Sequence, residues 1–237
     1  MSFAIVTIHN ESYAELAGMT FDKNKIPYCE KHSYKLFAKT SNFSEGTKVY
    51  FDKLRHCLEV LEQNPDLKWI WWLDCDAVIT NFNKKIEEFC DNNFICVLTC
   101  DNNSPNNGSF FLKNCDKSKQ FLRDVLSVED SFLDFNTFYK GCPWDNAAWN
   151  KIYDNSPEYQ TLFKIQRQRD FNSYSYISDY HRLTNRDMAM TGELNQWQPG
   201  DFVVHYAGLG LYPEIRDMLV ECMLICIQEL NLHVIKN

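Results

Sequence analysis

Residues 69–76 read WIWWLDCD: five apolar side chains run directly into Asp74 and Asp76, which are separated by one residue. An apolar run without alternation is typical of a strand that is buried on both faces. The end of such a strand opens at the centre of a sheet, and open α/β sheets bind their ligands beyond the carboxyl ends of their strands. The stretch therefore predicts a central strand that carries two carboxylates into a binding site.

Strand-like and helix-like patterns alternate along the rest of the chain. Apolar runs predict further strands at residues 3–8, 34–38, 94–100, 109–112 and 202–208. Helical spacing predicts helices at residues 22–32, 49–63, 84–90, 118–126, 146–153 and 213–230. This order predicts one α/β domain over residues 1–237, with a mixed, mostly parallel sheet flanked by helices. The less regular stretch 155–200 is expected to cover the active face.

The bulk composition excludes several kinds of partner. A net charge of −8 disfavours nucleic acid and anionic membrane surfaces as partners.

The chain begins with a strand-like pattern instead of a signal peptide, and its longest late apolar stretch is too short to cross a bilayer. None of its ten cysteines forms a CxxC pair, so buried free thiols in a reducing compartment are expected. These features predict a soluble, cytoplasmic protein without a transmembrane segment.

Two aspartates one residue apart at the end of a strand are suited to a divalent metal. Mg²⁺ and Mn²⁺ prefer oxygen ligands and often share them with substrate phosphates. His205, in FVVHYAG (202–208), lies in another predicted strand and would favour Mn²⁺, with Mg²⁺ as the alternative. Read alone, the aspartates could instead cap the following turn, and His205 could be a core histidine bonded to a backbone carbonyl.

Two further stretches combine small or polar residues with the start of an expected element. NNGSFFLKN (106–114) places Gly108 before an apolar strand, where a glycine lets the backbone approach a ligand closely. The alternative is an Asn-Gly hairpin turn. CPWDNAAWN (142–150) places Asp145 and Asn146 at the start of a predicted helix, where an aspartate is most often an N-cap.

The order and spacing of these stretches resemble family 34 glycosyltransferases, which include α-galactosyl-, mannosyl- and xyloglucan xylosyltransferases. The resemblance spans nearly the whole chain, and residues 69–81 are its most specific part. The matching stretches are HNESYAELAG (9–18), residues 51–81, NGSFFLKNC (107–115), WDNAAWNKIY (144–153), RDFNSY (169–174) and WQPGDFVVHYAG (197–208).

The resemblance implies a GT-A (Rossmann-like) fold, a nucleotide-sugar donor and Mn²⁺. It assigns Asp74 and Asp76 to the DxD metal motif, with His205 as a further metal ligand. Asp145 and Asn146 match the catalytic Asp-Gln pair of the family, near the reacting carbon. The residues that the resemblance places at the donor are Thr7, His9, Asn10, Asp74, Asn107, Gly108 and Ser109.

Two positions depart from the family pattern. Asn146 stands where the family often has Gln, which leaves the donor sugar open. Plant members carry a lysine shortly after the glycine that follows the histidine, whereas residues 208–211 contain no cation. Either one of three other basic residues, Lys53, Arg182 or Arg186, is therefore expected to meet the diphosphate, or the metal meets it alone.

The aromatic and polar stretch 169–182 is a candidate wall for the acceptor, because aromatic faces stack on sugar C–H surfaces while polar groups bond hydroxyls. Its members Phe171, Asn172 and Tyr174 are the expected acceptor residues. The alternative is that Phe171 and Tyr174 pack a lid onto the domain.

The expected activity is transfer of a hexose or pentose from a UDP- or GDP-linked sugar to a saccharide or glycan, with retention of configuration. Three alternatives stay open. An inverting enzyme would use Asp145 as its general base. A catalytically inactive protein of the same fold would bind sugar alone. A metal-dependent phosphohydrolase would also use DxD, but it fits the tryptophan-rich strand and the His-Tyr-Ala-Gly element poorly.

Overall fold

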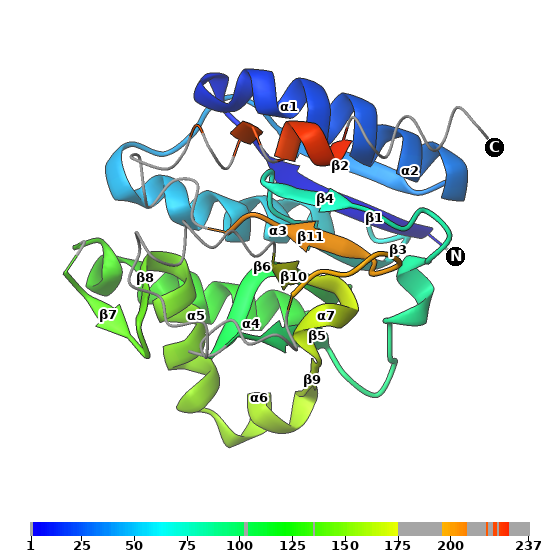
Figure 1. Ribbon diagram of the computed structural model, residues 1–237. Coiled ribbons are helices and arrows are strands. Elements are labelled where there is room, and N and C mark those ends of the chain that lie inside the picture. Colours follow the sequence, from blue (N-terminus) through cyan, green and yellow to red (C-terminus); the bar gives the residue numbers. More distant parts are fainter. Residues whose placement is uncertain are drawn as a thin grey trace.

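The computed structural model describes residues 2–101, 104–134, 136–174, 196–207, 217, 220–221 and 223–227. Its centre is a six-stranded sheet in the order β2–β1–β3–β6–β5–β9 (Figure 1). The strands are β1 (Ser2–Ile8), β2 (Lys35–Lys39), β3 (Leu67–Leu73), β5 (Cys96–Cys100), β6 (Pro105–Lys113) and β9 (Phe163–Gln166). Only β6 runs against its neighbours β3 and β5, whereas the other pairs in this sheet are parallel. The predicted mixed, mostly parallel sheet is confirmed.

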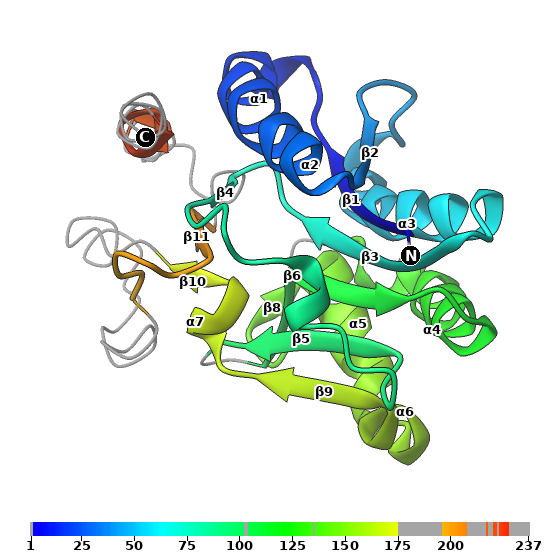
Figure 2. The same cartoon turned by 90° about the vertical axis from the view of Figure 1, so that its right-hand side faces the viewer.

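Helices cover both faces of this sheet (Figure 2), as predicted. Helices α1 and α2 lie on one side, and α3, α4 and α5 lie on the other. The helices are α1 (Ala14–Thr20), α2 (Ile26–His32), α3 (Asp52–Gln63), α4 (Asp116–Ser127), α5 (Trp144–Asp154), α6 (Pro157–Leu162) and α7 (Gln168–Phe171). Helix α1 was not predicted, and one turn of π-helix, Phe21–Lys25, joins it to α2.

One predicted helix and the irregular stretch need correction. Residues 84–90 contain only a 3-10 turn, Ile86–Glu88. Residues 217, 220–221 and 223–227 are helical, but the expected start at Pro213 lies outside the described residues. The first part of the stretch 155–200 is regular, because it forms α6, β9, α7 and the short strand β10 (Ser173–Tyr174).

A second, three-stranded sheet positions the candidate site. It has the order β10–β11–β4, where β4 is Ala77–Ile79 and β11 is Val203–His205. Strand β4 begins directly after Asp76 and pairs antiparallel with β11, so that His205 lies opposite Ala77. This pairing joins two segments that are far apart in the sequence. A separate hairpin joins β7 (Phe138–Tyr139) to β8 (Cys142–Pro143).

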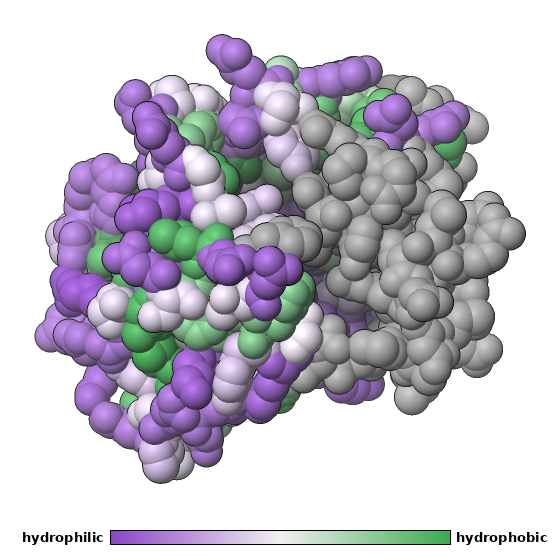
Figure 3. All heavy atoms as spheres, turned by 90° about the vertical axis from the view of Figure 1, so that its left-hand side faces the viewer, coloured by the Kyte–Doolittle hydropathy of each residue, from purple (hydrophilic) through white to green (hydrophobic). Residues whose placement is uncertain are grey.

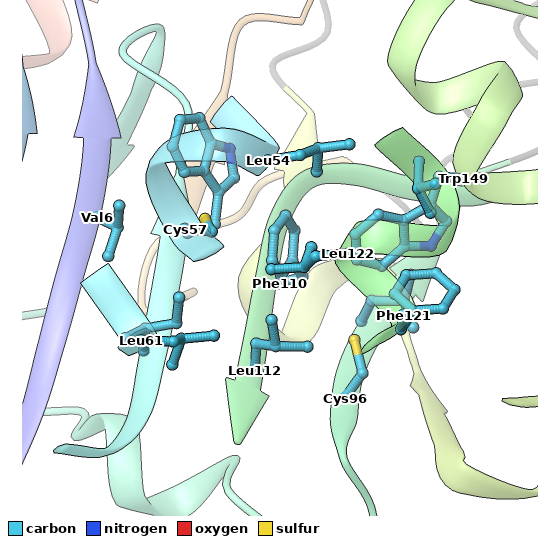
Figure 4. Packing of buried hydrophobic residues seen from close by; sticks show 14 of the residues in the cluster. Val6, Leu54, Cys57, Leu61, Cys96, Phe110, Leu112, Phe121, Leu122 and Trp149 are labelled. Carbon is cyan, nitrogen blue, oxygen red and sulfur yellow. The ribbon is translucent and has the colours of Figure 1, made fainter. Parts of the chain in front are cut away.

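Strand β3 is buried on both faces, which confirms the prediction from WIWWLDCD. Ile70 and Trp72 point into a cluster shared with α3, α4 and α5, while Trp69 and Trp71 point into a second cluster with α2. Each of these four side chains is at most 2% exposed. Figure 4 shows part of the first cluster, where Leu54 and Cys57 of α3, Phe121 and Leu122 of α4 and Trp149 of α5 surround Phe110.

Every cysteine that the structure describes has a free thiol, as predicted. Within the described ranges, the helices include none that is long and apolar enough to span a bilayer.

Candidate active site

Asp74, Asp76 and His205 converge where β3 and β11 end. One ligand atom from each of the three lies within 4.8 Å of the others. His205 Nε2 is 3.3 Å from Asp76 Oδ1 and 3.8 Å from Asp74 Oδ2. Two carboxylates with one imidazole form a donor set that fits Mn²⁺, and also Mg²⁺ through its oxygens. The three predicted metal-binding residues therefore lie together.

Backbone and side-chain hydrogen bonds hold this group in place. The Asp74 N–H donates to Gly108 O at 3.0 Å, and the Tyr206 N–H donates to Asp76 O at 3.0 Å. His205 Nδ1 lies 2.8 Å from Asn172 Oδ1. An Nδ1–H that donates to this amide oxygen leaves the lone pair on Nε2, the atom that faces the carboxylates. Asn172 thus fixes the orientation of the imidazole.

Burial and the neighbouring charges shift the pKa values of Asp74 and His205 in this group. Burial raises the pKa of Asp74, the Lys53 ammonium opposes this rise, and the Asp76 carboxylate adds to it. Burial alone would lower the pKa of His205, but the charges of Asp76 and Asp74 raise it above its ordinary value. A divalent cation between the two carboxylates would relieve their repulsion.

Lys53, on α3, connects the candidate metal-binding group, which consists of Asp74, Asp76 and His205, to Asp145. Its Nζ is 3.0 Å from Asp145 Oδ2, 3.7 Å from Asp74 Oδ1 and 3.0 Å from Asn107 Oδ1. Burial alone would lower the pKa of Lys53, but Asp145 and Asp74 raise it, so the side chain carries its charge. Of the three cations expected near the diphosphate, Lys53 lies in the site, whereas Arg182 and Arg186 are outside the described residues.

Asp145 and Asn146 lie in the first turn of α5 and both contact Asn107. Asn107 Nδ2 donates to Asp145 Oδ2 at 2.8 Å, and the Asn107 N–H donates to Asn146 Oδ1 at 3.2 Å. The N-cap of α5 is Pro143, so the alternative that Asp145 caps this helix is wrong. The Asp145 carboxylate faces the site instead.

Gly108 lies within β6, so the alternative of an Asn-Gly hairpin turn is wrong. A methyl group on its Cα would place Cβ 2.4 Å from His205 Cε1 and 3.0 Å from Asp74 Oδ2. Only a residue without a side chain leaves room for the imidazole here. The glycine predicted from close backbone approach thus makes space for the His205 imidazole.

A cavity of about 460 Å³ opens in front of these groups. Most of the residues expected at the donor line it: His9, Asn10, Asp74, Asn107 and Gly108, together with Asp145 and Asn146. Figure 3 shows the side of the molecule on which β1 ends, where apolar side chains lie among hydrophilic ones.

Two of the residues expected at the donor are enclosed by the protein instead. Thr7 is 1% exposed, and its Oγ1 has no hydrogen-bond partner within the described ranges. Ser109 is fully buried, accepts from Trp71 Nε1 and donates to Phe171 O, both at 3.0 Å. The hydroxyl of Ser109 therefore links β3, β6 and α7 and does not line the cavity.

The three expected acceptor residues have different surroundings. Phe171 is fully buried against Phe89 and Phe111, so its ring belongs to the core. Asn172 is also fully buried and holds the metal-binding imidazole. Only Tyr174 lines the cavity, where its hydroxyl donates to Asp101 Oδ2 at 3.1 Å.

Lys25 is a residue beside the site that the sequence did not reveal. It lies on the π-helical turn, is 1% exposed, and donates from Nζ to Ala77 O at 2.8 Å. Burial lowers the pKa of Lys25 to about 8. Its neighbour Asn24 bonds both the N–H and the carbonyl of Ile79. These contacts span more than fifty residues, and no local pattern signals them.

Comparison with known families supports the N-terminal part of the resemblance. The model of the galactosyl transferase GMA12/MNN10 family matches residues 4–91. Probable glycosyltransferase 7 of Oryza sativa subsp. indica is 26% identical over 147 residues, which are 58% of this chain and 28% of that protein. Probable xyloglucan 6-xylosyltransferase 5 of Arabidopsis thaliana is 30% identical over 109 residues, 42% of this chain and 24% of that protein. The chain thus spans about a quarter of the length of these relatives.

Solved structures extend the similarity in fold to nearly the whole chain. A glycosyltransferase involved in glycosylation of the major capsid of PBCV-1 has a TM-score of 0.68 at 18% identity, covering 95% of this chain and 100% of that one. The galactosyltransferase LgtC has a TM-score of 0.51 at 11% identity, covering 92% and 95%. These structural matches confirm the predicted GT-A fold. The family model over residues 4–91 and the sequence relatives confirm the resemblance to the family 34 glycosyltransferases.

Proposed function

We propose that this protein is a metal-dependent glycosyltransferase. It moves a hexose or pentose from a nucleoside diphosphate sugar, UDP- or GDP-linked, to a saccharide or glycan with retention of configuration. The observation that carries the proposal is the convergence of Asp74, Asp76 and His205 within 4.8 Å, beside Lys53 and Asp145. A hydrolase of simple phosphate esters would not need the large cavity beside these groups.

The cavity supports a donor of this size and charge. Its volume of about 460 Å³ lies in the range of small-molecule sites. The acidic pair and His205 would hold Mn²⁺, with Mg²⁺ as the alternative, and the ion would neutralise charge on the leaving diphosphate. Lys53 adds a fixed cation beside the same place, which serves the role that the sequence left to one of three basic residues.

The transfer exchanges one bond at the anomeric carbon for another. The bond from C1 to the phosphate oxygen breaks, and its electron pair leaves with the diphosphate. The acceptor hydroxyl oxygen forms the new bond to C1 on the same face, and its proton passes to the leaving phosphate oxygen. The Asp145 carboxylate stabilises the positive charge that develops at C1. Asn107 and Asn146, which contact each other, orient the sugar.

The surroundings of Asp145 favour retention over inversion. Asp145 Oδ2 accepts from Asn107 and pairs with Lys53, an arrangement that suits a fixed negative charge better than a group that takes up a proton. An inverting enzyme would use this carboxylate as its general base. The anomeric configuration of the product, determined by NMR, distinguishes the two mechanisms.

The first experiment is a thermal-shift panel of nucleoside diphosphates and nucleotide sugars, with and without Mn²⁺. A ligand at about 100 times its Kd stabilises the protein by about 2.7 kcal/mol, so a matching donor raises the melting temperature. We expect the shift to require Mn²⁺ and to disappear in Asp76→Ala. Equal shifts without metal, or no shift with any nucleotide, would overturn the proposal.

A second experiment tests turnover with the donor that the panel identifies. Asp145→Asn keeps the size of the side chain but removes its charge, so it should bind the donor and transfer sugar slowly. Near-normal transfer by Asp145→Asn would exclude the role of this carboxylate. Donor binding without transfer by the wild-type protein would indicate an inactive sugar-binding protein.

A further inference from the structure

We infer that Tyr50 and Trp144 form the platform on which the acceptor saccharide stacks. This inference rests on the proposed function and names the part of the cavity that takes the second substrate. The two rings lie parallel, with centroids 3.8 Å apart and planes 5° apart. Both residues line the cavity, as do Phe43 and Val49, so one part of the cavity wall is apolar.

The exposure of the pair leaves one ring accessible to a ligand. Trp144 is 5% exposed and belongs to the core cluster of α3, α4 and α5, whereas Tyr50 is half-buried at its edge. A rigid aromatic ring in the wall of a polar cavity offers a flat apolar surface at low entropic cost. The C–H face of a pyranose ring matches such a surface.

The backbone of Trp144 is held in an uncommon conformation. Its φ of +48° lies in the left-handed region, which is unfavourable for a bulky side chain. Lys140 and Gly141, in the adjoining β7–β8 hairpin, also have positive φ values of 51° and 74°. Strained residues of this kind persist where the surrounding structure fixes them, and they cluster at functional sites. Here the strained residue directly precedes the candidate catalytic residue Asp145.

Hydrogen bonds and ion pairs of Asp52 and Arg55 fix the start of α3, which directly follows Tyr50 and Phe51. Asp52 is 1% exposed and accepts from both the N–H and the hydroxyl of Ser44, each at 2.7 Å. Arg55 pairs with Asp52 at 3.2 Å and also with the buried carboxylate of Glu129. These bonds tie the loop that contains Phe43 to the start of α3. The apolar wall is thus preorganised.

The position of the platform suits the acceptor better than the donor. Tyr50 lies one turn before Lys53, and Trp144 directly precedes Asp145. Tyr50 and Asp145 line the same cavity. The metal-binding group and Lys53 hold the diphosphate end of the donor. A saccharide stacked on Tyr50 therefore presents its hydroxyls beside the carbon that reacts.

The test compares Tyr50→Ala with the matched control Tyr50→Phe, which keeps the ring. Saturation-transfer NMR is recorded with methyl α-mannopyranoside, methyl β-galactopyranoside and methyl β-xylopyranoside, in the presence of the nucleoside diphosphate that the panel identifies and of Mg²⁺, which is diamagnetic, in place of Mn²⁺. We expect saturation of pyranose C–H protons with the wild-type protein and with Tyr50→Phe. Binding to Tyr50→Ala should be about tenfold weaker, while its metal-dependent thermal shift with the donor is unchanged.

Three results would overturn the inference. Tyr50→Ala could bind the pyranosides as well as the wild-type protein does, or the wild-type protein could show no saturation with any of them. Tyr50→Ala could also lose the thermal shift with the donor sugar, which would assign the wall to the donor. Failure of the proposed function is a different result, because the wild-type protein would then show no metal-dependent shift with any nucleotide. Circular dichroism of Tyr50→Ala checks that the variant is folded.

Discussion

The substitution Gly108→Ala tests the geometry of the metal-binding group with one added methyl. The new carbon would lie 2.4 Å from His205 Cε1 and 3.0 Å from Asn106 Oδ1 and Asp74 Oδ2. Comfortable contact between carbon atoms begins near 3.5 Å, so the imidazole must move by about 1 Å. It cannot turn aside freely, because it is 3% exposed and Asn172 holds its Nδ1.

A displacement of this size should weaken metal binding more than it lowers the free energy of unfolding. Metal–ligand distances tolerate only about 0.2 Å. We therefore expect the Kd for Mn²⁺ to rise by about 10–100-fold, as when the partner of a metal-binding histidine is removed. Overpacking should lower the free energy of unfolding by about 1–3 kcal/mol.

Isothermal titration with Mn²⁺ measures the first effect, and urea unfolding measures the second. The matched control is Gly18→Ala in α1, where an added Cβ meets nothing within 4 Å and should stabilise the helix by about 0.5–1 kcal/mol. In a His205→Ala background the closest contact of the new methyl is gone, so most of its cost in stability should vanish. Wild-type affinity for Mn²⁺ in folded Gly108→Ala, or an equal cost in both backgrounds, would refute the reasoning.

Three other substitutions test the groups around the site. Asn172→Ala removes the acceptor for His205 Nδ1 and should weaken Mn²⁺ binding by about 10–100-fold in the same titration, whereas unchanged affinity would deny it an orienting role. Lys53→Met leaves the Asp145 carboxylate buried without a cation and should cost about 3–5 kcal/mol in urea unfolding. Adding Asp145→Asn to Lys53→Met should recover part of that cost, and no recovery would contradict the pairing. The pKa of Lys25 is lowered to about 8, so between pH 8 and 10.5 the unfolded chain holds more protons and stability rises with pH. Relative to Lys25→Met, the wild-type protein should gain up to about 3 kcal/mol over this window, and a constant difference across it would show that the lysine is not perturbed.

The parts of the site that follow from local patterns could be predicted from the sequence. The run WIWWL is buried on both faces of β3, and this burial alone places Asp74 and Asp76 at the centre of the sheet. The apolar strand containing His205 could be predicted for the same reason, although it is shorter than expected.

Contacts between distant segments could not be predicted in this way. Strand β4 has only three residues and exists because β11 pairs with it. The Asn-Gly pair at 107–108 has the composition of a turn, but the residues on either side of it pair with β3 and β5, and the strand continues through it at an irregularity. The roles of Lys25 and Asn172 likewise depend on partners that only the folded chain brings near.

The pairing of β4 with β11 assembles the site from two segments that are distant in the sequence. Asp74 and His205 are 131 positions apart, and the sheet that holds the aspartates is complete in sequence by residue 166. A chain that stopped before β11 would contain every strand of the large sheet and still lack the imidazole. Under the proposed function, binding of Mn²⁺ would therefore report whether β11 has docked, independent of how much of the large sheet has already formed.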